Sequence, residues 1–293
     1  MAIRILAVDV DGTLLDSRHQ LPPRNAAALA AATAQGIQVV LATGRRFNFV
    51  LPIIAALGCP CWVIASNGAL VRKFTPRDVV PGGGLDADWF RHFLPRAKAR
   101  AVLSLLAPYE DQAVITMPER DGQPELFMRP ERDPPAPGRR AFASWLRSNR
   151  NQLAFAAPLE TCLTADPVQL MYGGSVSDAR AIGAALAASP LAAELTCLQT
   201  LYPRRDLGIL DVLDRGVDKG AALAAVSAHL RIGATEVLAI GDNYNDLGML
   251  EFAGQAVLMG NAHAAMDRPG WARTADNDHD GVAATIEALL EGR

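Results

Sequence analysis

A short apolar run at residues 3–8 leads directly into two carboxylates separated by one residue, Asp9 and Asp11. An aliphatic run of this length, followed by Gly12, is typical of a buried strand. In open α/β sheets ligands bind just beyond the carboxyl ends of the strands, where both aspartates fall. Two close anions repel each other unless they share a cation or a proton. A divalent cation with oxygen ligands, such as Mg²⁺, meets this need, although Asp-Gly pairs also occur in plain turns.

The pattern of a strand followed by a helix recurs along the chain. Pro22 and Pro23 precede a helix that is expected at residues 26–35 and that Gly36 ends. Further elements are predicted in this order: strand 37–41, helix 47–57, strand 62–65, helix 218–230, strand 236–240, strand 255–259 and helix 281–290. Strands separated by helices of this length predict βαβ units and a parallel sheet. The expected fold class is therefore α/β, with a Rossmann-like parallel-sheet core.

The middle of the chain has a different pattern. It follows a Pro-Gly run at residues 81–84, which is typical of a flexible junction. Strands are expected at 112–117, 125–128, 167–172 and 195–201, and helices at 141–149 and 177–188. This mixture predicts an α+β domain inserted into the core. The expected boundaries are residues 1–82 and 206–293 for a discontinuous core and 83–205 for the insertion.

Composition excludes several classes of protein. A net charge of −3 and an aromatic content of 6% give no electrostatic or base-stacking argument for a nucleic-acid partner. Neither a signal peptide nor an apolar stretch of membrane-spanning length is present, so a cytoplasmic protein without a membrane partner is expected, a monomer by default. The four cysteines match no zinc or redox spacing.

Polar residues also follow the other strands predicted for the core. Thr43-Gly44-Arg45 follows the second strand, Asn67-Gly68 the third, and the group Asp242, Asn245 and Asp246 the strand at 236–240. Lys219 lies nearby, at the start of a predicted helix. Because a parallel sheet brings its carboxyl ends to one edge, these groups are expected to converge on a phosphate and metal site.

These motifs, in this order, resemble those of the haloacid dehalogenase superfamily, specifically Cof-like phosphatases with a large inserted cap of type IIB. Asp9-x-Asp11-Gly12-Thr13 is similar to the first motif of that superfamily and Thr43 to the second. Lys219 is similar to the third motif, and Gly241-Asp242-Asn243-x-Asn245-Asp246 to the fourth. The similarity covers the whole core, whereas the insertion matches a cap only in size and position.

The resemblance implies a phosphoric monoester hydrolase whose nucleophile, Asp9, forms an aspartyl-phosphate. It implies Mg²⁺ held by Asp9, by the backbone carbonyl of Asp11 and by Asp242. Asp11 would also act as general acid–base, and Lys219 would stabilise Asp9 and the transferred oxygens.

The remaining residues of the expected site would bind substrate or support the metal ligands. Thr43 and the Gly44 amide would hold phosphate oxygens, and Arg45, Asn67 and Asn245 are further candidates for phosphate binding. For Arg45, contact with substrate and a surface role are equally favoured. Asp246 is expected to orient the metal ligands and Lys219, with Asn245 as a second candidate for that role.

Three alternatives remain open at this stage. The substrate is expected to be a small phosphorylated metabolite, such as a sugar phosphate or a phosphorylated cofactor. A phosphomutase would use the same motifs, and a non-catalytic small-molecule-binding regulatory protein could keep the same fold. In the insertion, Arg129, Arg132, Arg204 and Arg205 are candidates for substrate contact, but a solvated surface role is favoured for each.

Overall fold

The computed structural model describes residues 2–75, 89–120, 124–130 and 137–292. The chain forms two compact units, the first made of Met1–Arg91 and Asp218–Arg293, the second of His92–Val217. The second unit is therefore inserted into the first. The chain crosses between the units at Arg91/His92 and at Val217/Asp218, whereas the expected crossings were at 82/83 and 205/206. The predicted Pro-Gly junction lies outside the described residues.

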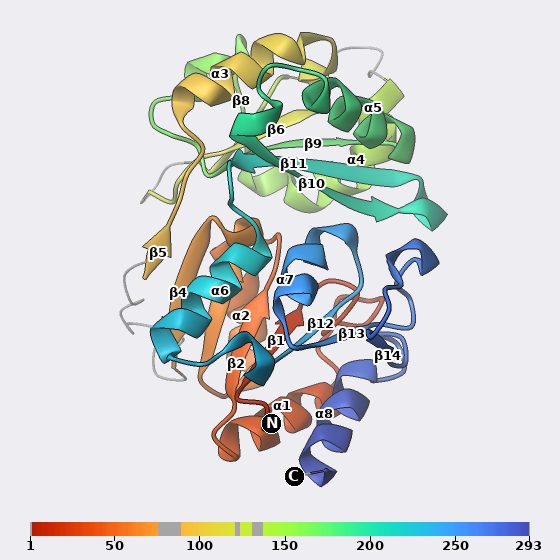
Figure 1. Ribbon diagram of the computed structural model, residues 1–293. Helices are drawn as coiled ribbons and strands as arrows, with labels where there is room; N and C mark the ends of the chain where they lie inside the picture. The colour runs from red at the N-terminus through yellow and green to blue at the C-terminus, as the bar shows by residue number, and fades with distance from the viewer. Residues whose placement is uncertain (1, 76–88, 121–123, 131–136, 293) are drawn as a thin grey trace. The chain divides into compact units, whose positions relative to one another are not determined.

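The first unit contains an eight-stranded sheet (Figure 1). Its strands lie in the order β14 (Ala272–Arg273), β13 (Gln255–Leu258), β12 (Val237–Gly241), β1 (Ile5–Asp9), β2 (Gln38–Ala42), β3 (Cys61–Ala65), β4 (Leu70–Phe74) and β5 (Phe90–Arg91). The six strands from β14 to β3 are parallel, five of them being the predicted core strands, and β4 and β5 extend the edge as antiparallel strands. The central strand β1 thus lies between β12 and β2, so the ends of all three strands meet.

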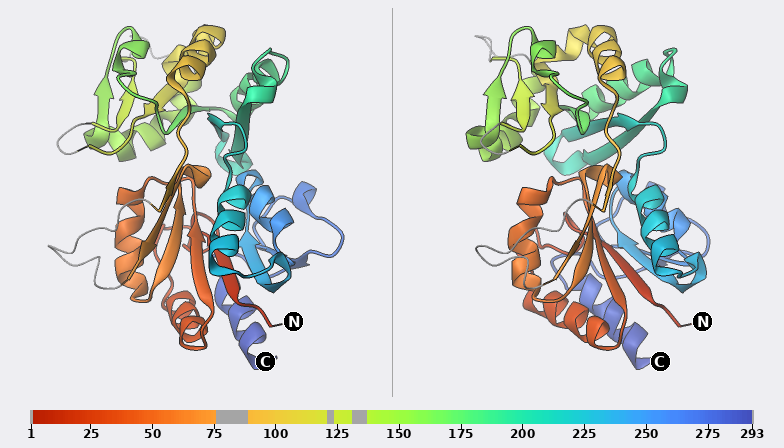
Figure 2. Two further views of the ribbon diagram at one scale, coloured as in Figure 1. Left: turned by 60° about the vertical axis from the view of Figure 1, so that its left-hand side comes forward. Right: turned by 90° about the vertical axis from the view of Figure 1, so that its left-hand side faces the viewer.

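Helices cover both faces of this sheet (Figure 2). Side chains of α1 (Pro23–Ala34), α2 (Phe47–Leu57) and α8 (Gly281–Glu291) pack on one face, and those of α6 (Lys219–Leu230) and α7 (Leu247–Phe252) on the other. The alternation of side chains along a strand explains the two layers, because Leu6 and Val8 join the first cluster while Ile5 and Ala7 join the second. A strand buried on both faces has few positions for charged residues except at its end.

The second unit contains a separate six-stranded sheet. Its strands lie in the order β10 (Leu195–Tyr202), β11 (Leu207–Asp214), β9 (Gln169–Gly174), β6 (Ala113–Thr116), β7 (Leu126–Met128) and β8 (Leu153–Phe155). α3 (Arg96–Leu105) and α5 (Val176–Ala187) pack on one face, and α4 (Pro137–Asn149) on the other. β11, which the sequence placed in the core segment 206–293, pairs antiparallel with β10 and β9 and belongs to this inserted unit.

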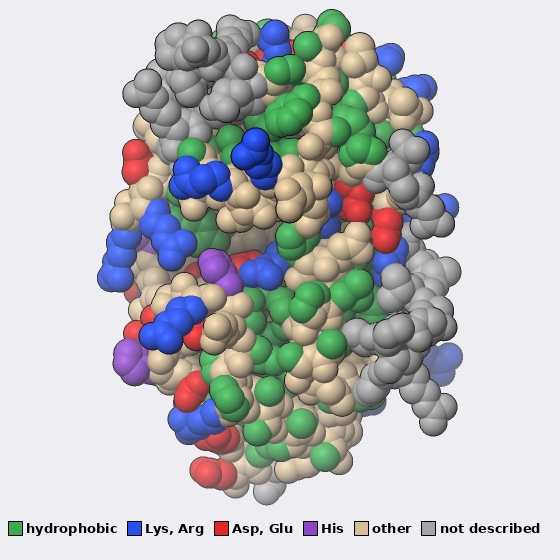
Figure 3. Space-filling model, turned by 180° about the vertical axis from the view of Figure 1, so that it is seen from behind, with side chains coloured by type: hydrophobic (Ala, Val, Ile, Leu, Met, Phe, Trp, Pro, Cys, Tyr) green, Lys and Arg blue, Asp and Glu red, His purple; other side chains and the backbone are tan. Residues whose placement is uncertain are grey.

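Several strands and helices were not predicted from sequence: β4, β5, β8, β11, β14, α3 and α7. On the face shown in Figure 3, hydrophobic side chains lie among charged side chains of both signs. No helix in the described part of the chain is both long enough and apolar enough to cross a membrane.

Candidate active site

Asp9 and Lys219 form a buried ion pair at the carboxyl end of β1. Asp9 is the last residue of this strand and Lys219 the first residue of α6, and their exposures are 4% and 0%. Lys219 Nζ lies 2.6 Å from Asp9 Oδ1 and 2.6 Å from Asp246 Oδ1. Burial alone would lower the pKa of Lys219, but the charges of Asp246 and Asp9 raise it. Lys219 is therefore a fixed cation between two carboxylates.

Asp246 is fully engaged by hydrogen-bond donors. Its Oδ1 accepts the Lys219 bond, and its Oδ2 accepts the backbone N–H groups of Asp242 and Asn243, each at 3.0 Å. Asp246 ends the short 3-10 helix Tyr244–Asp246, and its bond to Asn243 closes the capping box of that helix. This carboxylate therefore holds the loop after β12 and contacts Lys219.

Asp242 follows β12 and faces the loop after β1. Its Oδ1 accepts a hydrogen bond from Thr13 Oγ1 at 3.3 Å, and its Oδ2 accepts one from Asn261 Nδ2 at 3.2 Å. Gly12, at φ +82°, lies so close that an added Cβ would be 2.5 Å from Asp242 Oδ2. A glycine is thus required for the first loop to reach the Asp242 carboxylate.

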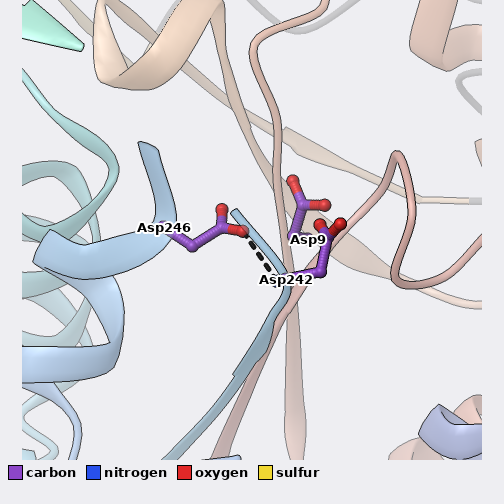
Figure 4. Close-up of side chains that lie close together, drawn as sticks. All are labelled: Asp9, Asp242 and Asp246. Atoms are coloured by element: carbon purple, nitrogen blue, oxygen red, sulfur yellow. Dashed lines mark hydrogen bonds between the residues drawn. The ribbon is translucent and has the colours of Figure 1, made fainter. Parts of the chain in front are cut away.

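The three carboxylates of Asp9, Asp242 and Asp246 fit a divalent cation. One ligand oxygen from each lies within 4.8 Å of the others, and Figure 4 shows the Asp9 and Asp242 carboxylates side by side. Burial raises the pKa of Asp9 to about 7, helped by Asp246 and opposed by Lys219. Burial, with the charges of Asp9 and Asp246, raises the pKa of Asp242 as well. Three carboxylates and one ammonium group leave about two negative charges uncompensated, which Mg²⁺ would neutralise.

Asp11 is paired with Arg45 rather than with the buried aspartates. Arg45 Nε and Nη2 donate to the two Asp11 oxygens at 2.7 and 2.5 Å, and His19 Nδ1 lies 3.4 Å from Oδ1. Burial would raise the pKa of Asp11, but the hydrogen bonds and charges of Arg45 and His19 lower it well below its usual range. Asp11 is therefore a carboxylate in this arrangement, and Arg45 holds that carboxylate in place.

The loops after β2 and β3 form a polar wall beside Asp11. Thr43 is fully buried, its Oγ1 accepts the backbone N–H of Arg45 at 3.1 Å, and its carbonyl accepts the N–H of Asn67 at 2.9 Å. Asn67 has a left-handed backbone (φ 53°, ψ 30°), and its Oδ1 accepts a hydrogen bond from Asn245 Nδ2 at 3.1 Å. A Cβ at Gly44 would lie 3.2 Å from Asn67 Oδ1. The five residues expected to bind phosphate thus lie together.

Gly68 explains how this wall meets α6. Its φ is +105°, and a Cβ there would lie 2.2 Å from the carbonyl oxygen of Asp218. Asp218 caps α6, since its Oδ1 accepts the N–H of Ala221 at 2.7 Å. The absence of a side chain at Gly68 therefore lets the loop after β3 pack against the start of the helix that carries Lys219.

The sequence analysis missed three residues of this site. Thr13 and Asn261 bond Asp242, and His19 approaches Asp11. Thr13 lies within the first motif, and Asn261 follows a predicted strand, so their positions gave a usable signal. For His19 we find no such signal.

The arginines of the insertion that were candidates for substrate contact differ in their surroundings. Arg129 Nη1 lies 2.6 Å from Glu110 Oε2, and Arg204 and Arg205 lie exposed in a short 3-10 helix. Arg132 is outside the described residues.

Comparison with known proteins agrees with this geometry. Residues 6–132 and 193–286 match the family model of the haloacid dehalogenase-like hydrolases. Phosphatase YwpJ of Bacillus subtilis (strain 168) is 30% identical, covering 98% of this chain and 100% of its own. Pyridoxal phosphate phosphatase YbhA of Escherichia coli (strain K12) is 27% identical, covering 99% and 100%.

Solved structures with a similar fold belong to the same family. The solved structure of a haloacid dehalogenase-like hydrolase from B. subtilis superimposes with a TM-score of 0.78, at 26% identity, covering 98% of this chain and 100% of that one. The predicted α/β fold and the predicted class of phosphoric monoester hydrolase are thereby confirmed. The chain belongs to the haloacid dehalogenase-like hydrolase family, among its phosphatases.

Proposed function

We propose that this protein is a Mg²⁺-dependent phosphatase of small phosphorylated metabolites that works through an aspartyl-phosphate on Asp9. The observation that carries the proposal is the buried group of Asp9, Asp242 and Asp246 around Lys219. Phosphate monoesters are anions, and a carboxylate attacks them only where positive charge is already fixed in place. Lys219 supplies one such charge, and two carboxylates remain for a cation.

Asp9 is the proposed nucleophile because Lys219 holds only one of its oxygens by hydrogen bond. One carboxylate oxygen would attack phosphorus, the bond from phosphorus to the substrate oxygen would break, and an acyl phosphate would form. Water would then attack phosphorus, releasing inorganic phosphate and restoring Asp9. Lys219 would stabilise the charge on the transferred oxygens in both steps.

Asp11 is the proposed general acid and general base. It would give a proton to the leaving oxygen and take one from the attacking water. Its bidentate pair with Arg45 favours the charged form, which suits the second step. For the first step we propose that substrate phosphate draws Arg45 away from Asp11, which also gives Arg45 a part in substrate binding.

The remaining residues are proposed to bind phosphate or hold the cation. The hydroxyl of Thr43, the Gly44 amide, Asn67 and Asn245 line the loops after β2, β3 and β12. Asp9, the Asp11 carbonyl and Asp242 are the proposed Mg²⁺ ligands, with Asp246 in support because both its oxygens already accept hydrogen bonds. When bound, Mg²⁺ would offset the charge of nucleophile and substrate and orient the phosphoryl group.

A relative of this chain indicates which substrate class to test first. YbhA is named for pyridoxal phosphate, a phosphorylated cofactor, which makes that class the first to test. A phosphomutase would use the same nucleophile but would pass the phosphoryl group to a second hydroxyl instead of water. Nothing in the site favours that acceptor.

A phosphate-release screen tests the proposal. Wild type and Asp9→Asn would be compared on pyridoxal phosphate, hexose phosphates and an aryl phosphate, with Mg²⁺ and with EDTA. We expect release by wild type with Mg²⁺ only, and none by Asp9→Asn. Full activity of Asp9→Asn would refute the covalent mechanism, and activity in EDTA would refute the metal requirement.

A further inference from the structure

Asn261 occupies a position that the proposed chemistry does not yet use. It lies in the turn after β13, and its Nδ2 donates to two acceptors, Gly12 O at 2.9 Å and Asp242 Oδ2 at 3.2 Å. The side chain therefore joins the loop after β1, which carries the two aspartates of the first motif, to the carboxylate of the fourth.

The orientation of the Asn261 amide is fixed from the other side. Its Oδ1 accepts the backbone N–H of Asn277 at 3.2 Å. Because an amide oxygen only accepts and an amide nitrogen only donates, this bond directs Nδ2 toward Gly12 and Asp242. Asn277 in turn donates its own Nδ2 to Leu15 O at 2.9 Å, so two asparagines brace the loop after β1.

The Asp242 carboxylate depends on few donors. Thr13 Oγ1 donates a hydrogen bond to Asp242 Oδ1, and Asn261 Nδ2 donates one to Asp242 Oδ2. Both donors are uncharged. Asp242 itself is only 8% exposed, so water replaces a lost donor poorly. Hydrogen bonds to a ligating carboxylate set its orientation and strengthen metal binding.

We propose that Asn261 is a positioning residue that holds Asp242 in its metal-binding orientation. The inference rests on the proposed function, because it takes Asp242 as a ligand of Mg²⁺. Asn261 touches neither Asp9 nor Lys219 through any bond present among the described residues, so its effect would pass through Asp242 and the loop at Gly12. Its loss should therefore weaken Mg²⁺ binding more than it slows the enzyme once Mg²⁺ is saturating.

Calorimetric titration of the metal-free protein with Mg²⁺ measures this directly. Asn261→Ala and the similarly sized Asn261→Leu remove the donor, and since Asn261 is exposed, neither variant opens a cavity in the core. We expect each to raise the Kd for Mg²⁺ by about tenfold or more. The thermal unfolding midpoint in EDTA shows that each variant is folded, and kcat at saturating Mg²⁺ should fall by a smaller factor than the Kd for Mg²⁺ rises.

Asn277→Ala is the matched control. It removes the bond to Leu15 O but leaves the backbone N–H that orients Asn261, so its Kd for Mg²⁺ should change much less. An equal rise in Kd for Asn277→Ala, or an unchanged Kd for both Asn261 variants, would overturn the role of Asn261. If Asp242→Ala loses Mg²⁺ binding while the Asn261 variants keep it, the proposed function stands and this inference alone fails. If wild type binds no Mg²⁺, both fail.

Discussion

At the scale of single residues, the site concentrates charge that destabilises the folded protein. Asp9 is buried beside two further carboxylates, and burial raises its pKa to about 7. A carboxyl group whose pKa is higher in the folded than in the unfolded state favours unfolding once it ionises. The cost is absent below the unfolded pKa and grows as the pH rises toward 7. Shifted pKa values of this kind are common at functional sites.

Replacing Asp9 by Asn should therefore stabilise the metal-free protein at high pH. In EDTA, we expect the unfolding midpoint of Asp9→Asn to lie closest to that of wild type near pH 4 and to exceed it by several degrees near pH 8, because the pKa of Asp9 is raised to about 7 in the folded protein. Adding Mg²⁺ should reverse the order, because only wild type keeps the full ligand set. Scanning calorimetry at both pH values measures the difference, and a variant that is less stable by the same amount at both would contradict this account.

At the scale of elements, the first turn of a helix positions a residue of the proposed active site. α6 begins at Lys219, and its cap Asp218 packs against Gly68 in the loop after β3. The cap thus stabilises the first turn of α6 and, with it, the position of the Lys219 side chain. α5 of the inserted unit has a comparable cap, in which Ser175 Oγ accepts the N–H of Asp178 at 3.0 Å.

These two caps give a matched pair of variants. Asp218→Ala and Ser175→Ala should each lower the free energy of unfolding by about 1 kcal/mol, the usual value of a cap. Only Asp218→Ala should also lower kcat, because only that helix carries a residue of the proposed site. Urea unfolding and phosphate release test this together, and an equal loss of kcat in both variants would show that stability alone controls activity.

At the scale of the whole molecule, the chain consists of two units with separate cores. The inserted unit has its own sheet, and its apolar residues form two clusters of their own. We expect the fragment 92–217 to fold by itself, with a cooperative unfolding transition in circular dichroism and no phosphate release. A fragment without such a transition would show that this unit needs the rest of the chain.

The sequence predicted the core better than the insertion, for physical reasons. Strands such as β1 and β12 are buried on both faces, so their apolar runs are continuous and end in the polar residues of the site. β11 has partly buried positions among its buried ones and includes the buried Asp211, which gives a weaker pattern, and its residues were placed in the core segment instead of the insertion. The motifs predicted most residues of the proposed site, but the bidentate pair of Asp11 with Arg45 depends on side-chain geometry that spacing does not encode.

In the proposed reaction, the phosphoryl group passes from the substrate to Asp9 and then to water. The most direct measurement is an acid quench of the enzyme with an aryl phosphate and Mg²⁺, followed by mass spectrometry of the peptide that contains residue 9. We predict a phosphoryl group on Asp9 that accumulates further in Asp11→Asn, where its hydrolysis is slowed, and that is absent from Asp9→Asn. Turnover by wild type with no trapped phosphoryl group in either wild type or Asp11→Asn would contradict the account.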